Sequence, residues 1–294
     1  MSRVTESMIY GSMRGQIERS QNRLLDANDV ASTGRRANRP SDDPVAVDRE
    51  MLFRSYQNRL ESMDRVSNRV RDDLSVTESA LNDSQNILTR TRKIAINAGN
   101  GALNERDRGS LAAEVGEMRE ALLSLANSEV AGRYVFGGNA TGGPPFQDDG
   151  TFVGDGAARE VEVLDGRTVR ANIPGSEVFA GGAPVDVFQL LEDLETDLLN
   201  NDSAGATSRL DDIASALQQV EDGRTQIGVA VNSLDNSDDL RAEIDERLNE
   251  AILESVGEDQ AASYVDLVEA QTAMQNALQQ AARILSGFQQ SPLF

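Results

Sequence analysis

Any chemistry in this chain would have to be done by carboxylates, serines or a single lysine. The 294 residues include 49 aspartates and glutamates but neither cysteine nor histidine. Without histidine, no serine has the usual partner that abstracts its proton. A serine–lysine pair would need Lys93, the one lysine, which lies in a region of helical heptad spacing. We therefore expect no catalytic residues and a protein that is not an enzyme.

Two acidic clusters could offer oxygen ligands to calcium: SLDNSDDL at 233–240 and FQDDG at 146–150. Neither has the EF-hand loop spacing with its closing glutamate. The absence of cysteine and histidine removes the common zinc ligands. We expect both clusters to be solvated acidic turns, and no metal or cofactor to be bound. The glycine-rich FGGNATGG at 136–143 lacks a phosphate-binding strand–loop–helix context and predicts a plain loop.

Charge is distributed unevenly along the chain, whose net charge is −21. Residues 1–40 carry a net charge of +3, whereas residues 186–260 carry −16. An acidic body disfavours nucleic acid as a partner. No apolar run is long enough for a membrane span or a secretory signal core. We expect a soluble protein, cytoplasmic unless it is exported by a route that reads no cleaved signal.

Apolar residues spaced three and four apart predict long helices. One helix is expected from Pro44 to Ala98, roughly 80 Å long at about 1.5 Å per residue. Glycines at 99 and 101 end it, and Asn104 with Asp107 forms a capping signal for a third helix that folds back antiparallel. Helical spacing returns from residue 186 onward. The predicted fold class is mainly α: an elongated rod of long antiparallel helices, a coiled-coil-like bundle, with a small inserted β domain.

The stretch TGRRANRPSDDPVAV at 33–47 separates the first two predicted helices. Gly34 can end the first helix in the left-handed conformation. Asp43 followed by Pro44 is typical of an N-cap and the first helical position. The stretch is therefore a helix stop and a helix start with a polar loop between them.

Residues 134–185 are rich in glycine and β-branched residues and predict the β insert. REVEVLDGRTVRANI alternates apolar and polar residues around Asp165-Gly166. That pattern predicts a hairpin with a type I′ turn, which needs positive φ at both central residues. The predicted segments are a terminal helix with its loop at 1–43, the rod at 44–133 and 186–260, the β insert at 134–185 and a second terminal helix at 261–294.

The two ends carry similar heptad stripes of small side chains and are expected to lie side by side. Because two such helices bury little apolar area, we expect neighbouring subunits to complete the surface. The predicted assembly residues on the stripes are Tyr10, Met13, Ile17, Leu24, Leu267, Met274, Ile284 and Phe288.

Three blocks in order, STGRRANRPSDDPVA, LNERDRGSLAAEVGEMREALLSLANS and GRYVFGG, resemble the flagellin superfamily. Within it the chain is most similar to the members at the junction between hook and filament. The resemblance implies a structural protein whose terminal helices form the flagellar core. It also implies that the loop is a spoke between core and rod, whose charged residues contact neighbouring subunits: Arg35, Arg36, Arg39, Asp42 and Asp43.

The implied partners are flagellin, the first hook-associated protein, further copies of the chain in a ring and a flagellar export chaperone. The implied location is extracellular, in the flagellum, after type III export without a cleaved signal. Two alternatives stay open. One is a flagellin filament subunit, and the other is a cytoplasmic helical scaffold that shares the heptads but has no need of the loop at 33–47.

Overall fold

The computed structural model describes the backbone of residues 2–100 and 103–289 and, within these ranges, the side chains of residues 7–286. The chain divides into two compact units. Unit 1 is Met1–Arg59 with Glu243–Phe294, and unit 2 is Leu60–Ala242. The described residues form long helices and only two small two-stranded sheets, so the mainly-α prediction is confirmed. The division into five segments stays a prediction.

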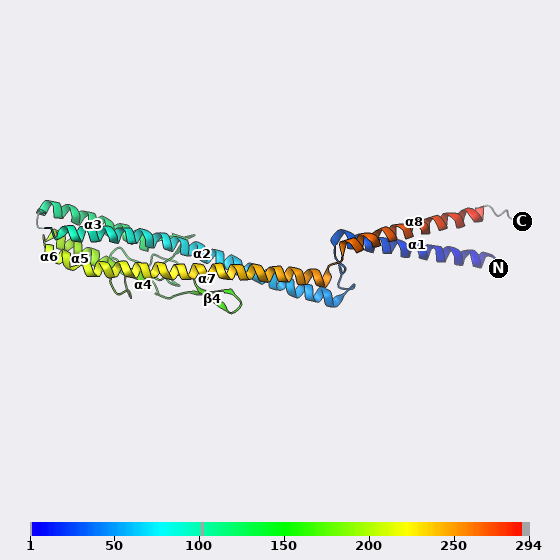
Figure 1. Ribbon diagram of the computed structural model, residues 1–294, viewed down its shortest axis with the longest axis horizontal. Coiled ribbons are helices and arrows are strands. Elements are labelled where there is room, and N and C mark those ends of the chain that lie inside the picture. The colour runs from blue at the N-terminus through cyan, green and yellow to red at the C-terminus, as the bar shows by residue number, and fades with distance from the viewer. Residues whose placement is uncertain (1, 101–102, 290–294) are drawn as a thin grey trace. The chain divides into compact units, whose positions relative to one another are not determined.

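Unit 1 pairs the two ends of the chain. Helices α1 (Ser2–Thr33) and α8 (Gln260–Gln289) pack side by side, as the sequence predicted (Figure 1). Helix α2 (Pro44–Ala98) begins in this unit and α7 (Leu210–Val256) ends in it. A small apolar cluster holds these parts together: Ala37, Ala46, Ile252 and Val256, with Val47 and Phe53 against them.

Local signals between α1 and α2 act as the sequence predicted. Gly34 has φ +66° and donates its N–H to Val30 O at 2.8 Å, which ends α1. Asp43 Oδ1 accepts a hydrogen bond from the Ala46 N–H at 3.0 Å, and α2 starts at Pro44. The cap and the proline together fix the first turn of α2.

Unit 2 is built on the central parts of α2 and α7, with α3 (Glu105–Ala126), α5 (Val187–Leu199) and the short α6 (Ser203–Ser208). Asn104 caps α3 by accepting the Asp107 N–H at 2.9 Å, as predicted. Helix α3 turns back along α2, where Arg90 Nε donates to Glu114 Oε1 at 2.7 Å (Figure 1). The antiparallel return of α3 is therefore confirmed.

The β part of unit 2 contains β1 (Glu129–Val130) paired with β2 (Arg133–Tyr134), and β3 (Glu160–Leu164) paired with β4 (Arg167–Arg170), followed by the short α4 (Gly175–Val178). The β3–β4 hairpin turns at Asp165-Gly166, as predicted. The predicted type I′ turn is wrong. Gly166 has φ +74° but Asp165 does not have a positive φ, and an irregularity between Glu162 and Leu164 accommodates the turn instead.

Five phenylalanines form an aromatic core inside unit 2, which the sequence analysis did not find. Phe179 packs edge-on against Phe136 and Phe146, with ring centroids 5.1 and 5.8 Å apart, and Phe152 and Phe188 complete the cluster. Four of the five rings are buried in the same core as the leucines of α2 and α5. The β part is therefore packed into the helical unit rather than standing apart from it.

Candidate assembly interface

The α1–α8 pair is closed by a seam of small side chains. Ser263, Ala270, Ala277 and Ala281 of α8 are buried. Five predicted assembly residues are half-buried along the same seam: Met13, Ile17, Leu24, Leu267 and Met274. Their first partner is therefore the other terminal helix of the same chain, and contact of these side chains with a neighbouring subunit stays a prediction.

A second apolar face of α8 is left open. Tyr264, Val265 and Val268 are 57%, 58% and 60% exposed, and Leu278 and Leu285 are about half exposed. Most of these residues stand one or two positions from the seam residues, which is about 100° to 200° around a helix. The sequence analysis missed this face because it followed one stripe only. The sequence YVDLV at 264–268 indicates this face, because four of its five residues are apolar and a single heptad stripe would include only one or two of them.

The remaining predicted stripe residues lie toward the chain ends. Tyr10 and Ile284 are exposed at 43% and 37%. Phe288 lies outside the residues whose side chains the structure describes.

The loop between α1 and α2 is joined to the connection between α7 and α8. Arg35 and Gly257 form an antiparallel bridge. The Arg36 N–H donates to Val256 O at 2.7 Å, and the Glu258 N–H donates to Gly34 O at 3.0 Å. These backbone bonds fasten residues 34–36 to residues 256–258, which are far apart in the sequence.

Glu50 is the electrostatic centre of this joint. It is 5% exposed, accepts a hydrogen bond from Arg54 Nε at 2.7 Å and ion-pairs with Arg35 of the loop. Burial raises the pKa of the Glu50 carboxyl, but hydrogen bonds from Arg54 and Arg35 outweigh it and hold the pKa below its ordinary value. Sequence reasoning did not find Glu50, since nothing near it in sequence indicates burial.

The other predicted loop residues also make contacts within the chain. Arg36 Nη2 donates to Ser255 O at 2.9 Å, and Arg39 lies 3.9 Å from Asp29. Asp42 accepts N–H groups of Asn38 and Arg39, while Asp43 caps α2. Arg36 and Arg39 stay more than half exposed as side chains. Their contacts with other subunits remain a prediction.

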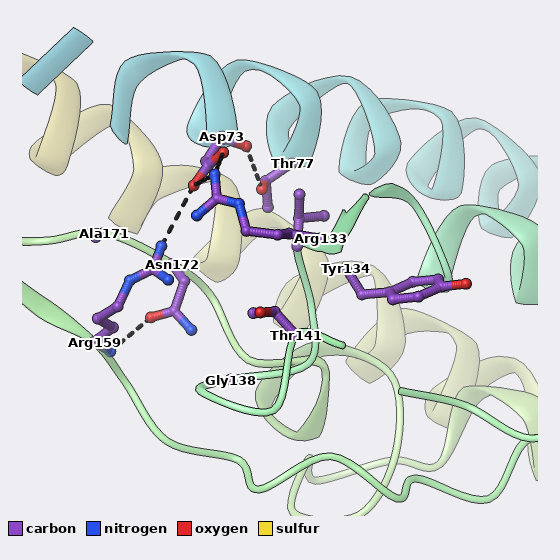
Figure 2. A pocket seen from close by; sticks show the side chains of 10 residues that line it. Asp73, Thr77, Arg133, Tyr134, Gly138, Thr141, Arg159, Ala171 and Asn172 are labelled. Carbon is purple, nitrogen blue, oxygen red and sulfur yellow. Dashed lines mark hydrogen bonds and ion pairs between the residues drawn. The ribbon is translucent and has the colours of Figure 1, made fainter. Parts of the chain in front are cut away.

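A polar cavity lies where the β part meets α2 (Figure 2). Arg133 and Arg159 both reach Asp73, with closest N–O distances of 2.9 and 3.4 Å. Asn172 Oδ1 accepts the Arg159 N–H at 2.7 Å. The cavity is about 10 Å³, room for about one water molecule. The two arginines therefore fasten the β part to α2 and do not form a ligand site.

The acidic clusters show no metal site. Residues 233–240 lie inside α7, so the predicted turn is wrong there: Asp235 and Asp238 bind Arg71 of α2 at 2.9 and 2.6 Å. In residues 146–150, Asp149 accepts the Thr151 N–H at 2.8 Å in an exposed turn. No group of three or more candidate metal ligands occurs among the described residues. Among these residues, no helix is long and apolar enough to cross a membrane.

Residues 4–141 match the family model described as the bacterial flagellin N-terminal helical region. The flagellar hook-associated protein 3 of Escherichia coli (strain K12) is 28% identical over 276 residues, which cover 87% of this chain and 83% of that protein. The chain is similar to flagellar hook-associated protein 3 over most of its length.

The chain also shares its fold with solved structures. A putative flagellar hook-associated protein from Vibrio parahaemolyticus has a TM-score of 0.68 at 22% identity and covers 73% of this chain and 99% of its own. The flagellar junction protein FlgL from Legionella pneumophila has a TM-score of 0.59 at 18% identity and covers 71% and 100%. At these identities the likeness shows the fold alone.

Proposed function

We propose that this chain is a structural protein of the bacterial flagellum that joins hook to filament. Its partners are the first hook-associated protein on the hook side, flagellin on the filament side and further copies of itself in a ring. Similarity to hook-associated protein 3 over most of the chain supports a place in the flagellum. Filament flagellin is the weaker alternative, because the two hook-associated proteins match 87% and 88% of the chain, whereas a matching polar flagellin covers 67%.

The single observation that carries the assembly role is the open apolar face of α8. Tyr264, Val265 and Val268 expose most of their surface within two helical turns, although α1 already covers the opposite seam. Apolar side chains exposed together beside a seam that is already covered mark a surface for a further protein partner. Burying the exposed part of each of these side chains would contribute about 1 kcal/mol or more.

The seam itself adds to this argument. Its buried residues on α8 are three alanines and a serine, which gain little when they leave water. The paired ends therefore have more to gain from further subunits than from each other. Terminal helices that become ordered on assembly are expected to gain more stability from neighbouring subunits than from each other.

The location follows from the same proposal. The chain leaves the cell through the flagellar type III apparatus without a cleaved signal, escorted by an export chaperone that binds its C-terminal region. The support for this step is the similarity alone.

Shearing the surface appendages of the source cells tests the proposal. Quantitative mass spectrometry of the sheared fraction should find this chain as a minor component beside abundant flagellin. A chain as abundant as the filament protein would instead be flagellin. A chain absent from appendages and retained in the cell body would be a scaffold, and the junction role would be wrong.

A further inference from the structure

Unit 1 has an open groove between the start of α2 and the end of α7. Its volume is about 410 Å³. The apolar part of its lining is Ala46, Phe53, Ala251 and Val45, which is 60% exposed, and the other five lining residues are polar or charged. An open groove of this size with an apolar part in its lining can accept a protruding apolar side chain.

Two arginines stand at this groove. Arg49 has no hydrogen-bond or ion-pair partner among the described residues. Arg36 donates to Ser255 O and lies 3.7 Å from Asp43, which also lines the groove together with Glu254. Arg49 is therefore the cation that is available to an incoming acidic group.

The opposite face of α7 carries the complementary features. Leu253 is 68% exposed. It stands two positions from both Ala251 and Ser255, which line the groove, and so points roughly 200° away from them. Glu246 and Glu250 precede Leu253 by seven and three residues, which places them on its side of the helix. Both are exposed and have no hydrogen-bond or ion-pair partner among the described residues.

We propose that Leu253 of one copy of this chain docks in the α2–α7 groove of the next copy, with Glu250 and Glu246 facing Arg49. The inference rests on the proposed self-association and names the surface that makes it. One chain carries both halves of the contact: Arg49, which has no partner among the described residues, at the groove, and two exposed carboxylates beside Leu253. This complementarity of charge is the reason to assign the groove to a second copy rather than to another protein.

The contact is heterologous, because the leucine and the groove lie on opposite faces of the same helix pair. Each copy that fills one groove presents a new Leu253 to a further copy. Contacts of this kind repeat around a ring or along a helix and do not stop at a dimer. This is the geometry that an annular junction requires.

Engineered cysteines test the contact directly, since the chain has none of its own. The full-length Val45→Cys/Leu253→Cys variant, oxidised at high concentration, should form a ladder of dimers, trimers and larger species. A matched control pairs Val45→Cys with Val229→Cys, because Val229 is similarly exposed at 62% but lies in unit 2. No ladder above this control would overturn the proposal. Efficient dimers from Leu253→Cys alone would show a symmetric contact and would overturn it too.

Charge reversal gives an independent readout by sedimentation. Arg49→Glu and Glu250→Arg should each weaken self-association about tenfold, since each places like charges opposite one another. The Arg49→Glu/Glu250→Arg double variant should recover most of the lost affinity. The control is Arg92→Glu, which reverses the charge of an exposed residue in unit 2 and should not change self-association. Additive losses in the double variant would contradict the pairing.

The two proposals can fail separately. A ladder from the purified chain, with none of it in sheared appendages, would reject the junction role and keep the contact. Incorporation into appendages without a Val45→Cys/Leu253→Cys cross-link there would keep the role and reject the contact.

Discussion

Arg35 and Glu50, 15 residues apart in the sequence, form an ion pair that holds the loop after α1 against the buried side of α2. The same carboxylate binds Arg54, so one buried acid serves two arginines. The pair lies beside the backbone bonds that fasten residues 34–36 to residues 256–258. Arg35 therefore stabilises its own chain at the joint.

Glu50→Gln should loosen this joint. The change removes the charge from two charge-assisted hydrogen bonds and should cost about 2 kcal/mol of local stability. Hydrogen exchange at the Arg36 and Glu258 amides should then speed up. Glu61→Gln is the control, because Glu61 pairs with Arg65 at 3.9 Å on an exposed surface and should change little. Equal exchange in both variants would contradict the role of Glu50.

The same carboxylate should make the stability of the joint decrease in acid. Burial raises the pKa of Glu50, and the arginine hydrogen bonds lower it by more, so the folded pKa lies below the ordinary value of 4.5. A lowered folded pKa stabilises the fold above the ordinary pKa, and this contribution is lost as the pH falls through the folded pKa. The difference in the free energy of unfolding between the natural chain and Glu50→Gln should therefore be constant above about pH 5 and shrink below about pH 4. Urea titrations across this range measure it; a difference that grows in acid would be the wrong sign.

Phe179→Ala should destabilise unit 2 severely. The ring is fully buried between Phe136 and Phe146, and its loss leaves a cavity that costs about 4 kcal/mol. Urea unfolding followed by circular dichroism measures the loss. Val153→Ala, at a position 50% exposed, should stay within about 0.5 kcal/mol of the natural chain. A similar loss in both would mean that the aromatic cluster is not the core of this unit.

The open face of α8 should matter for assembly and not for folding. Val265→Ser/Val268→Ser alters two exposed side chains, so the free energy of unfolding should change by less than about 1 kcal/mol. Incorporation into sheared appendages should fall sharply. Ala270→Asp, which buries a charge in the seam, should instead separate α1 from α8 in the monomer. Normal incorporation of the double serine variant would remove the basis of the assembly role.

Deleting residues 265–294 should spare unit 2, whose contacts lie within Leu60–Ala242. Limited proteolysis should still protect residues 60–242, while α1, without its partner helix, should be cut quickly. The truncated chain should be missing from sheared appendages. Normal filaments that contain it would contradict the function assigned to this end.

Local features of the fold were predictable from the sequence. The start and the end of a helix depend on a few neighbouring residues. The helices begin or end as predicted at Gly34, at Asp43 with Pro44, and at Asn104. Heptad spacing predicted the long helices for the same reason. The seam between the two chain ends followed from their matching stripes.

Contacts between distant segments were not predictable in this way. Asp235 and Asp238 looked like a solvated turn, because their partner Arg71 lies more than 160 residues away on another helix. Glu50 looked like an ordinary surface acid, and its burial depends on the loop that folds over it. The phenylalanine cluster gathers rings from four separate segments, so no single stretch shows it.

The pairing of residues 34–36 with residues 256–258 also bears on how the chain is made. Arg36 reaches the carbonyl of Ser255, 219 residues further on. During translation unit 2 can fold while the last helix is still on the ribosome, since domains generally fold as units as they emerge. Unit 1 has to wait for residues 256–289. Until then the nascent chain carries α1 without its partner helix, and the joint cannot close before residues 256–258 have emerged.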